Sequence, residues 1–192
     1  MAIIDWDTSR FPIHDLSVTS NNPVYKNTSL NLKTTTRPRN LNQIQLDFTT
    51  TVGGFTEAKK LQAYVNQLTN GKNQCRIRLG GGIFANPNVT TVNATVAANT
   101  GADHISLTSN AMIEAGSYFN IPNDNKIYQL VNNVTVGEVE IWPPLRKPLV
   151  NGAPLGFASP YLVGEVSSNA IATEHTSQGL IVTVQLTIME VL

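Results

Sequence analysis

The side chains that most often carry out catalysis or bind metal ions are few and scattered in this chain. The three histidines, His14, His104 and His175, lie far apart, and none has the spacing that places two metal ligands on one helix face. Serine is frequent, but no Gly-x-Ser-x-Gly motif marks a nucleophile elbow, and only a Ser-His-Asp triad assembled from distant segments is left open. We therefore expect no metal site, no cofactor and no enzymatic activity.

Two pairs of carboxylates have the spacing of a shared strand face. Asp5 and Asp7, and likewise Glu138 and Glu140, are two residues apart, so both members of a pair point to the same side of a strand. Such a pair could bind a hard cation or take part in acid–base chemistry. Solvated surface charge is the commoner explanation for such pairs, and it is the one we favour here.

Basic and aromatic residues are candidates for contacts with a partner molecule. Arg37 and Arg39 form a small basic cluster, which is too weak a signal to predict nucleic-acid binding. The two tryptophans could serve recognition, and packing in a core or against another subunit is the competing explanation. The candidate partner contacts are Trp6, Arg37, Arg39, Trp142 and Arg146.

Composition is that of a neutral globular protein. Of the 192 residues 41% are hydrophobic and 14% charged, with thirteen basic and thirteen acidic residues, so no net charge attracts the chain to nucleic acid or to a membrane surface. The single cysteine, Cys75, is expected to be a buried thiol. No signal-like segment or long apolar run is visible, so we expect a protein that is neither exported by a cleaved signal nor membrane-spanning.

One amphipathic helix is predicted over residues 56–70. Thr56 is a candidate cap, Glu57 suits the positive helix start, and Gly71 suits a left-handed stop. The apolar residues that share one face of this helix are Ala58, Leu61, Val65 and Leu68.

Alternating patterns predict strands on either side of a strand-rich middle segment. Residues 42–50 and 180–192 alternate between apolar and polar side chains, and the second of these strands must complete a sheet built by the first part of the chain. Between residues 104 and 146, short runs of β-branched and aromatic residues are separated by Gly, Asn, Asp and Pro clusters. The fold class predicted is mainly β with one helix.

The chain is predicted to contain two modules. The Gly80-Gly81-Gly82 run lacks the Lys-Ser/Thr of a phosphate-binding loop and is interpreted as a flexible junction. We therefore predict a first domain made of residues 1–80 and 161–192, with residues 81–160 inserted as a second module.

The order of these segments resembles that of the distal tail proteins of long-tailed bacteriophages. The most distinctive stretch is Trp142-Pro143-Pro144-Leu145-Arg146. The other segments that carry the resemblance are residues 56–64, 76–79, 115–121, 127–130, 139–141 and 184–190. The resemblance implies that the first domain is a tail-tube-like β-sandwich with one α-helix and that the inserted module is an OB-like β-barrel.

The resemblance also implies a structural role in a virion tail. Proteins of that family form a ring, commonly a hexamer, which joins the tail tube to the baseplate hub and its fibre proteins. DNA crosses the lumen of the ring only in transit. The implied partners are other copies of the chain and the tube, hub and fibre proteins, with no membrane, and assembly takes place in the host cytoplasm.

Two other classes of function are kept open. A carbohydrate-binding β module would use an exposed aromatic platform such as Trp142 or Tyr128 with amide and carboxylate partners, and it could serve host-surface recognition. A small hydrolase would need a pocket that gathers a histidine, a carboxylate and a nucleophile.

Overall fold

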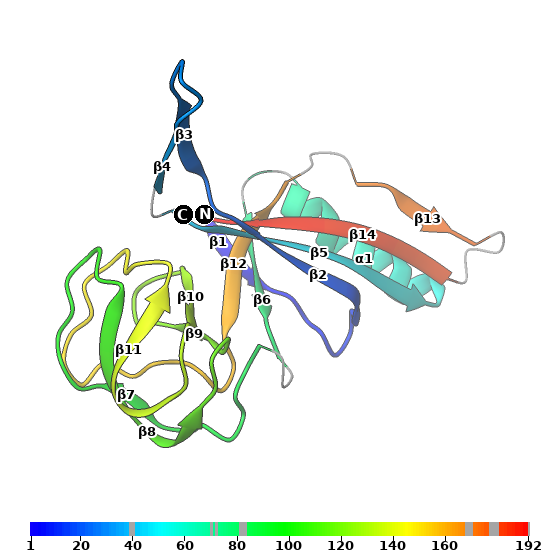
Figure 1. Cartoon of the computed structure of the whole chain (residues 1–192). Coiled ribbons are helices and arrows are strands. Elements are labelled where there is room, and N and C mark those ends of the chain that lie inside the picture. The colour runs from blue at the N-terminus through cyan, green and yellow to red at the C-terminus, as the bar shows by residue number, and fades with distance from the viewer. Residues whose placement is uncertain are drawn as a thin grey trace. The chain divides into compact units, whose positions relative to one another are not determined.

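The chain folds into two compact units, in which strands predominate and a single helix is present among the residues described (Figure 1). The computed structural model describes residues 1–38, 41–69, 71, 73–80, 84–167, 171–176 and 181–191. The sheet unit consists of Met1–Ser20, Gln43–Ile77 and Val163–Leu192, and the barrel unit consists of Asn21–Asn42 and Arg78–Leu162. The predicted fold class, mainly β with one helix, is confirmed.

The unit boundaries differ in detail from the predicted ones. The inserted module begins after Ile77 instead of after residue 80, and it ends at Leu162 instead of at residue 160. The segment Asn21–Asn42, which the sequence placed in the first domain, groups with the barrel unit. Residues 81 and 82 of the predicted glycine junction lie outside the described residues.

The sheet unit is built on a seven-stranded sheet. Its strand order is β1-β6-β12-β14-β5-β2, and β13 pairs with β14 beside this path. The strands are β1 (Ala2–Asp5), β2 (Ile13–Asn21), β5 (Gln43–Gly53), β6 (Asn73–Arg78), β12 (Tyr161–Val166), β13 (Thr173–His175) and β14 (Ile181–Glu190).

The two longest strands of this sheet, β5 and β14, pair in antiparallel register from Ile181 opposite Gly53 to Met189 opposite Gln45. Every second side chain is buried, because successive residues of a strand point to opposite faces. The buried apolar positions are Ile44, Leu46, Phe48, Val52, Val182, Val184, Leu186 and Ile188. The prediction that the last strand completes a sheet built by the first part of the chain is confirmed.

The helix α1 (Phe55–Thr69) lies against the buried face of β5 (Figure 1). It begins one residue earlier than predicted, since the Gly54 carbonyl accepts the Ala58 amide at 3.0 Å. Thr56 therefore lies within the first turn and is not the cap. Gly71 has the predicted left-handed backbone, with φ of 67°. The buried helix residues are Leu61, Val65 and Leu68.

The barrel unit holds a second, curled sheet with the strand order β7-β8-β11-β10-β9. The strands are β7 (Val92–Ala94), β8 (His104–Ile113), β9 (Tyr118–Asn120), β10 (Ile127–Leu130) and β11 (Val134–Trp142). The order β8-β11-β10-β9 is a Greek key. The consecutive strands β9, β10 and β11 form a meander, and β8 pairs with β11, the last strand of that meander. The module is thus a curled sheet of five antiparallel strands, and its assignment to the OB-like class stays a prediction.

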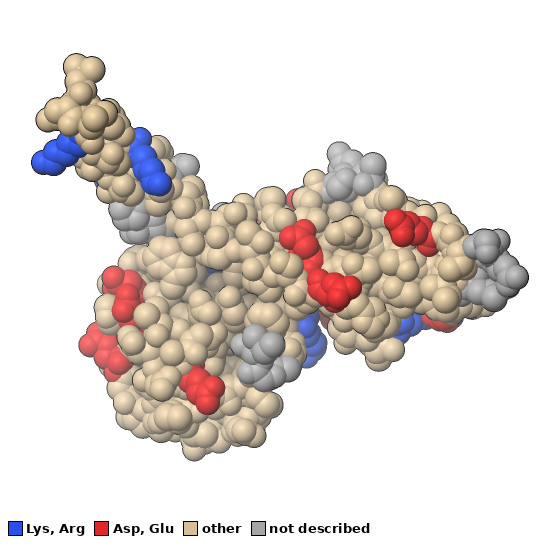
Figure 2. Space-filling view, turned by 45° about the vertical axis from the view of Figure 1, so that its right-hand side comes forward, with Lys and Arg blue, Asp and Glu red and all other residues tan. Residues whose placement is uncertain are grey.

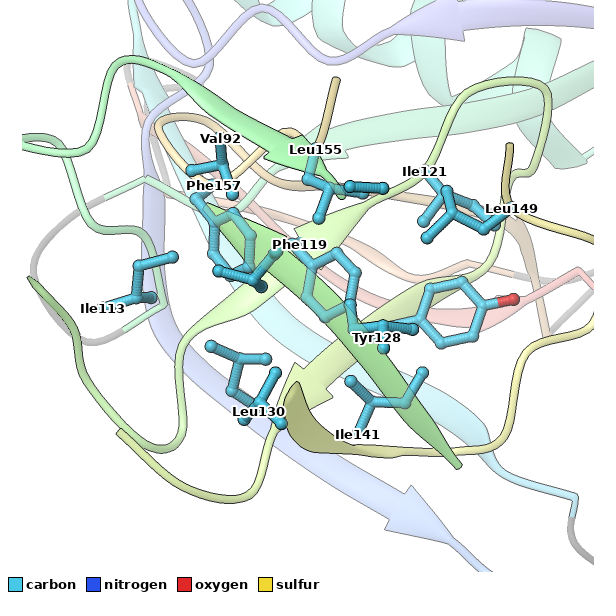
Figure 3. Close-up of a cluster of buried hydrophobic side chains, with 14 of the residues drawn as sticks. Val92, Ile113, Phe119, Ile121, Tyr128, Leu130, Ile141, Leu149, Leu155 and Phe157 are labelled. Atoms are coloured by element: carbon cyan, nitrogen blue, oxygen red, sulfur yellow. The ribbon is translucent and has the colours of Figure 1, made fainter. Parts of the chain in front are cut away.

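Residues 153–157 close this sheet into a small barrel. The Leu155 amide donates to the Val92 carbonyl of β7 at 2.9 Å, and the Gly156 amide donates to the Asn120 carbonyl of β9 at 3.0 Å. The barrel interior is a single apolar cluster, at whose centre the rings of Phe119 and Phe157 stack with centroids 4.7 Å apart (Figure 3). The closing segment therefore supplies both backbone partners and core side chains.

Candidate functional site

Residues capable of catalysis or metal binding are not gathered into a site in the part of the chain that the structure describes. Within that part, no group of three or more His, Cys, Asp or Glu side chains has the geometry of a metal site. His104 hydrogen-bonds its neighbour Asp103, at 2.9 Å, and this hydrogen bond raises the pKa of the imidazole, with smaller contributions from Glu138 and Glu140. Cys75 is buried, as predicted, and desolvation raises the pKa of its thiol to about 12.

The carboxylate pairs have different environments. Asp7 shapes a turn, because its carboxylate accepts the amides of Ser9 and Arg10 at 3.1 and 3.2 Å. Glu138 and Glu140 lie on the same exposed face of β11, on either side of the buried Val139. The predicted shared strand face is therefore confirmed for the second pair.

Trp6 is a core residue, and the prediction that it contacts a partner is wrong. Its side chain is 4% exposed, and its indole nitrogen donates to the Phe11 carbonyl at 2.9 Å. Edge-on ring contacts join it to Phe48 and to Tyr64 of α1, with centroids 5.1 and 5.3 Å apart. The indole therefore fills the space between the first strand, the sheet and the helix.

The most exposed element of the chain is a hairpin of β3 (Val24–Thr28) and β4 (Thr34–Pro38), here called the arm. Every residue from position 21 to 37 is exposed. Leu30 and Leu32 at the turn are 107% and 83% exposed, and the predicted contact residue Arg37 lies on β4. Arg39 lies outside the described residues. An isolated two-stranded hairpin is marginally stable in water, so this arm is suited to being covered by another molecule.

A buried lysine anchors the base of the arm. The ammonium of Lys126, a residue 2% exposed, donates to the Asn42 carbonyl at 2.8 Å and to the Asn42 side-chain oxygen at 3.2 Å. The Asn42 amide in turn donates to the side chain of Asn22 at 2.8 Å. Asn22 and Asn42 lie on either side of the arm in the sequence, so this network joins the two ends of the hairpin to the barrel. Sequence reasoning missed it, because lysine is ordinarily a surface residue.

We expect the Lys126→Met substitution to lower the free energy of unfolding of the barrel unit by about 2 kcal/mol, since it leaves the two Asn42 oxygens buried without this donor. Amide hydrogen exchange at the base of the arm should become faster. Urea unfolding and exchange followed by mass spectrometry measure the two effects. The control is Lys147→Met, in which an exposed lysine of the same unit is lost, and equal effects of both substitutions would contradict the anchoring role.

The outer face of the barrel brings together residues that are distant in the sequence. Register places Gln129 of β10 opposite Trp142, and Glu140 of β11 opposite His104. Trp142 is partly exposed and ends the row that contains Glu138 and Glu140. The result is an outer face with one aromatic ring, carboxylates, an amide and an imidazole.

Arg146, a further predicted contact, borders a buried hydrogen-bond network. Its guanidinium lies 3.7 Å from the carboxylate of Asp124, a side chain only 2% exposed. The Tyr128 hydroxyl donates to Asp124 at 2.8 Å and accepts the Arg146 amide at 2.9 Å. Tyr128 is thus a core residue whose hydroxyl is satisfied internally, so it does not offer the exposed platform that the sequence allowed.

The polar face of the sheet unit carries a shallow hollow of about 560 Å³. Its lining residues are Thr49, Val166, Ile171, Ala172, Glu174, Thr183, Gln185 and Thr187. This lining contains hydroxyls, one amide and one carboxylate, and it lacks a histidine or cysteine that would pair with a nucleophile. The chemistry of the hollow is that of a hydrophilic surface.

Comparison with known proteins assigns no relationship, since no family model and no curated protein matches the chain. Within the described residues, no helix is both long enough and apolar enough to cross a membrane. The case for a function therefore depends on the surfaces of the chain itself.

Proposed function

We propose that this protein is a structural subunit of a ring, hexameric in the simplest case, at the distal end of a phage tail tube. In this role it joins the tube to the baseplate hub and fibres and surrounds the path of the DNA. The observation that carries the proposal is the arm, because an exposed hairpin that ends in two leucines gains stability when another subunit covers it. The role is one of assembly and not of catalysis.

The ends of the large sheet support the same proposal. β2, a strand of nine residues, and β1 lie at the two ends of the strand order. Edge strands have unpaired backbone N–H and C=O groups with which a strand of another chain can pair. A contact between two different edges can repeat around a ring. Ring closure would cover both ends of the sheet.

The charge distribution of the sheet suits a channel for DNA. Six of its seven strands, β1, β2, β5, β12, β13 and β14, contain no lysine or arginine, and the exception is β6, which contains Arg76 and Arg78. The face opposite the helix displays the polar residues Gln45, Asp47, Thr49, Thr51, Thr183, Gln185 and Thr187. DNA binding depends largely on cations that neutralise phosphates, so a surface with few of them lets the polymer pass without being retained. We therefore assign this face to the lumen.

Light scattering of the purified protein, followed by negative-stain microscopy, tests the proposal. We expect rings with a central hole for the wild-type chain, and a shift towards monomer when Leu30→Ser and Leu32→Ser are combined. Because both leucines are exposed, thermal stability should stay unchanged. Val96→Ser with Val150→Ser, which changes two exposed valines of the barrel unit, is the matched control. A wild-type protein that stays monomeric at high concentration and in the presence of tail tubes would contradict the ring.

Carbohydrate binding is a second candidate, favoured by the outer face of the barrel. There Trp142 lies beside Gln129 and in the same row as Glu140, and an aromatic ring with polar neighbours is the usual arrangement for stacking and hydrogen bonding to a sugar. Glycan-array binding that is lost in Trp142→Ala and kept in Tyr25→Ala would support it. No binding to any glycan would remove this candidate.

A further inference from the structure

The outer face of β8 and β11 is an acidic surface in which His104 is the one basic neighbour among the described residues, and it is here called the acidic face. Its carboxylates are Glu138 and Glu140, which are exposed on β11, and Asp103, which precedes β8. Among the described residues, neither Glu138 nor Glu140 forms an ion pair, and Asp103 pairs only with His104. Neighbouring like charges on one strand face repel each other, so a cationic partner would relieve this repulsion.

The arm has the opposite charge. Lys26 and Arg37 lie on its two strands and Lys33 lies at its turn, whereas positions 21–38 contain no acidic residue. Among the described residues, none of these three cations forms an ion pair. Figure 2 shows basic side chains on the hairpin and acidic side chains on the barrel unit. The arm and the acidic face are therefore complementary in charge.

Apolar residues accompany the charges on both surfaces. The arm ends in the exposed Leu30 and Leu32. On the acidic face, Val136 precedes Glu138 on the same side of β11 and is 69% exposed, and Met112 on β8 is 56% exposed. Each surface thus combines a charged stretch with an apolar end, which is the composition of a subunit contact with a packed centre and a charged rim.

We propose that the arm of one copy of this chain binds the acidic face of the next copy. Within one chain the two surfaces are exposed and form no ion pair with each other among the described residues, so the contact that joins them is intermolecular. Because the arm and the acidic face are different patches, the contact is heterologous, and it repeats into a ring when its rotation closes. This inference rests on the proposed ring and names the contact that holds it together.

Charge reversal tests the pairing. An arm variant carries Lys26→Glu and Arg37→Glu, and a face variant carries Glu138→Lys and Glu140→Lys. Each variant alone places like charges in contact, so we expect the concentration needed for assembly, measured by light scattering, to rise by at least about tenfold. Reversing the charge of an exposed residue of the helix, in Lys59→Glu, should leave assembly unchanged. Equal melting temperatures show that all variants are folded.

Mixing the arm variant with the face variant gives the decisive result. In an alternating ring, the acidic arms of one variant meet the basic faces of the other, and the basic arms meet the acidic faces, so two chains that stay monomeric alone should assemble together. If both variants formed rings as readily as the wild-type chain, the pairing would be overturned, whereas the proposed ring would not. Variants that fail to assemble alone and also in the mixture would overturn the pairing as well. A wild-type chain that does not self-associate would overturn both proposals.

Discussion

The substitution Phe157→Ala is expected to lower the free energy of unfolding of the barrel unit by about 4 kcal/mol, within the range for removing a fully buried aromatic ring. Phe157 is 1% exposed, and its ring stacks on Phe119 with an interplanar angle of 20°. Its loss leaves a cavity among the clustered side chains drawn in Figure 3, because most of them belong to hydrogen-bonded strands and cannot collapse inward.

The effect of this substitution should be confined at first to the barrel. Native-state hydrogen exchange, followed peptide by peptide, should show faster exchange in residues 92–157, and urea unfolding gives the free energy. Phe55→Ala is the control, since Phe55 is 60% exposed on α1 and its loss should change stability by less than about 0.5 kcal/mol. A cost below about 1 kcal/mol for Phe157→Ala would mean that residues 153–157 do not belong to the core.

The long regular elements were predictable from the sequence because their hydrophobic period continues over many residues. Val182, Val184 and Leu186 alternate with polar residues along β14, and every one of them is buried. In α1 the helical spacing similarly identified Leu61 and Val65 as core positions. In both elements the residues that the local pattern marks as apolar are also the residues that tertiary packing buries, so the pattern alone was sufficient to predict the core positions.

Features that depend on distant contacts could not be predicted in the same way. Residues 153–157, which include Pro154 and Gly156, close the barrel through single bridges, and such bridges leave no periodic pattern in the sequence. The buried position of Lys126 follows from an acceptor 84 residues away, at Asn42. The sequence around Trp6 likewise contains no pattern that distinguishes a buried indole from an exposed one.

The candidate surfaces were predictable only in part. The sequence identified the pair Glu138 and Glu140 as a shared strand face, but not that His104 lies opposite Glu140 in the neighbouring strand. It marked Arg37 as a candidate contact without showing that the whole hairpin around it is exposed, since exposure is a property of the fold and not of the residues. Leu30 and Leu32 were not recognised at all, because two leucines in a polar segment resemble part of a small core.

The substitution Gly164→Ala is expected to destabilise the sheet unit by about 3 kcal/mol, the upper end of the usual cost of overpacking. A β-carbon at this position would lie 2.5 Å from the Ile188 side chain and 2.6 Å from the Met189 carbonyl oxygen. Ile188 and Met189 belong to the central strand β14, which is held on its other side by β5, so the backbone oxygen cannot move away. Larger residues at position 164 should be more damaging than alanine.

Gly156→Ala is the matched control, because a β-carbon there would meet only the Asn120 carbonyl oxygen, at an ordinary contact distance of 3.8 Å. We expect urea unfolding and hydrogen exchange to show a weakened sheet unit for Gly164→Ala and little change for Gly156→Ala. The pairing of Gly164 with Glu190 leaves room for no side chain at this point. If Gly164→Ala were as stable as the parent protein, β12 would have to pair with β14 in another register, and the chain would re-enter the large sheet from the barrel at a different position.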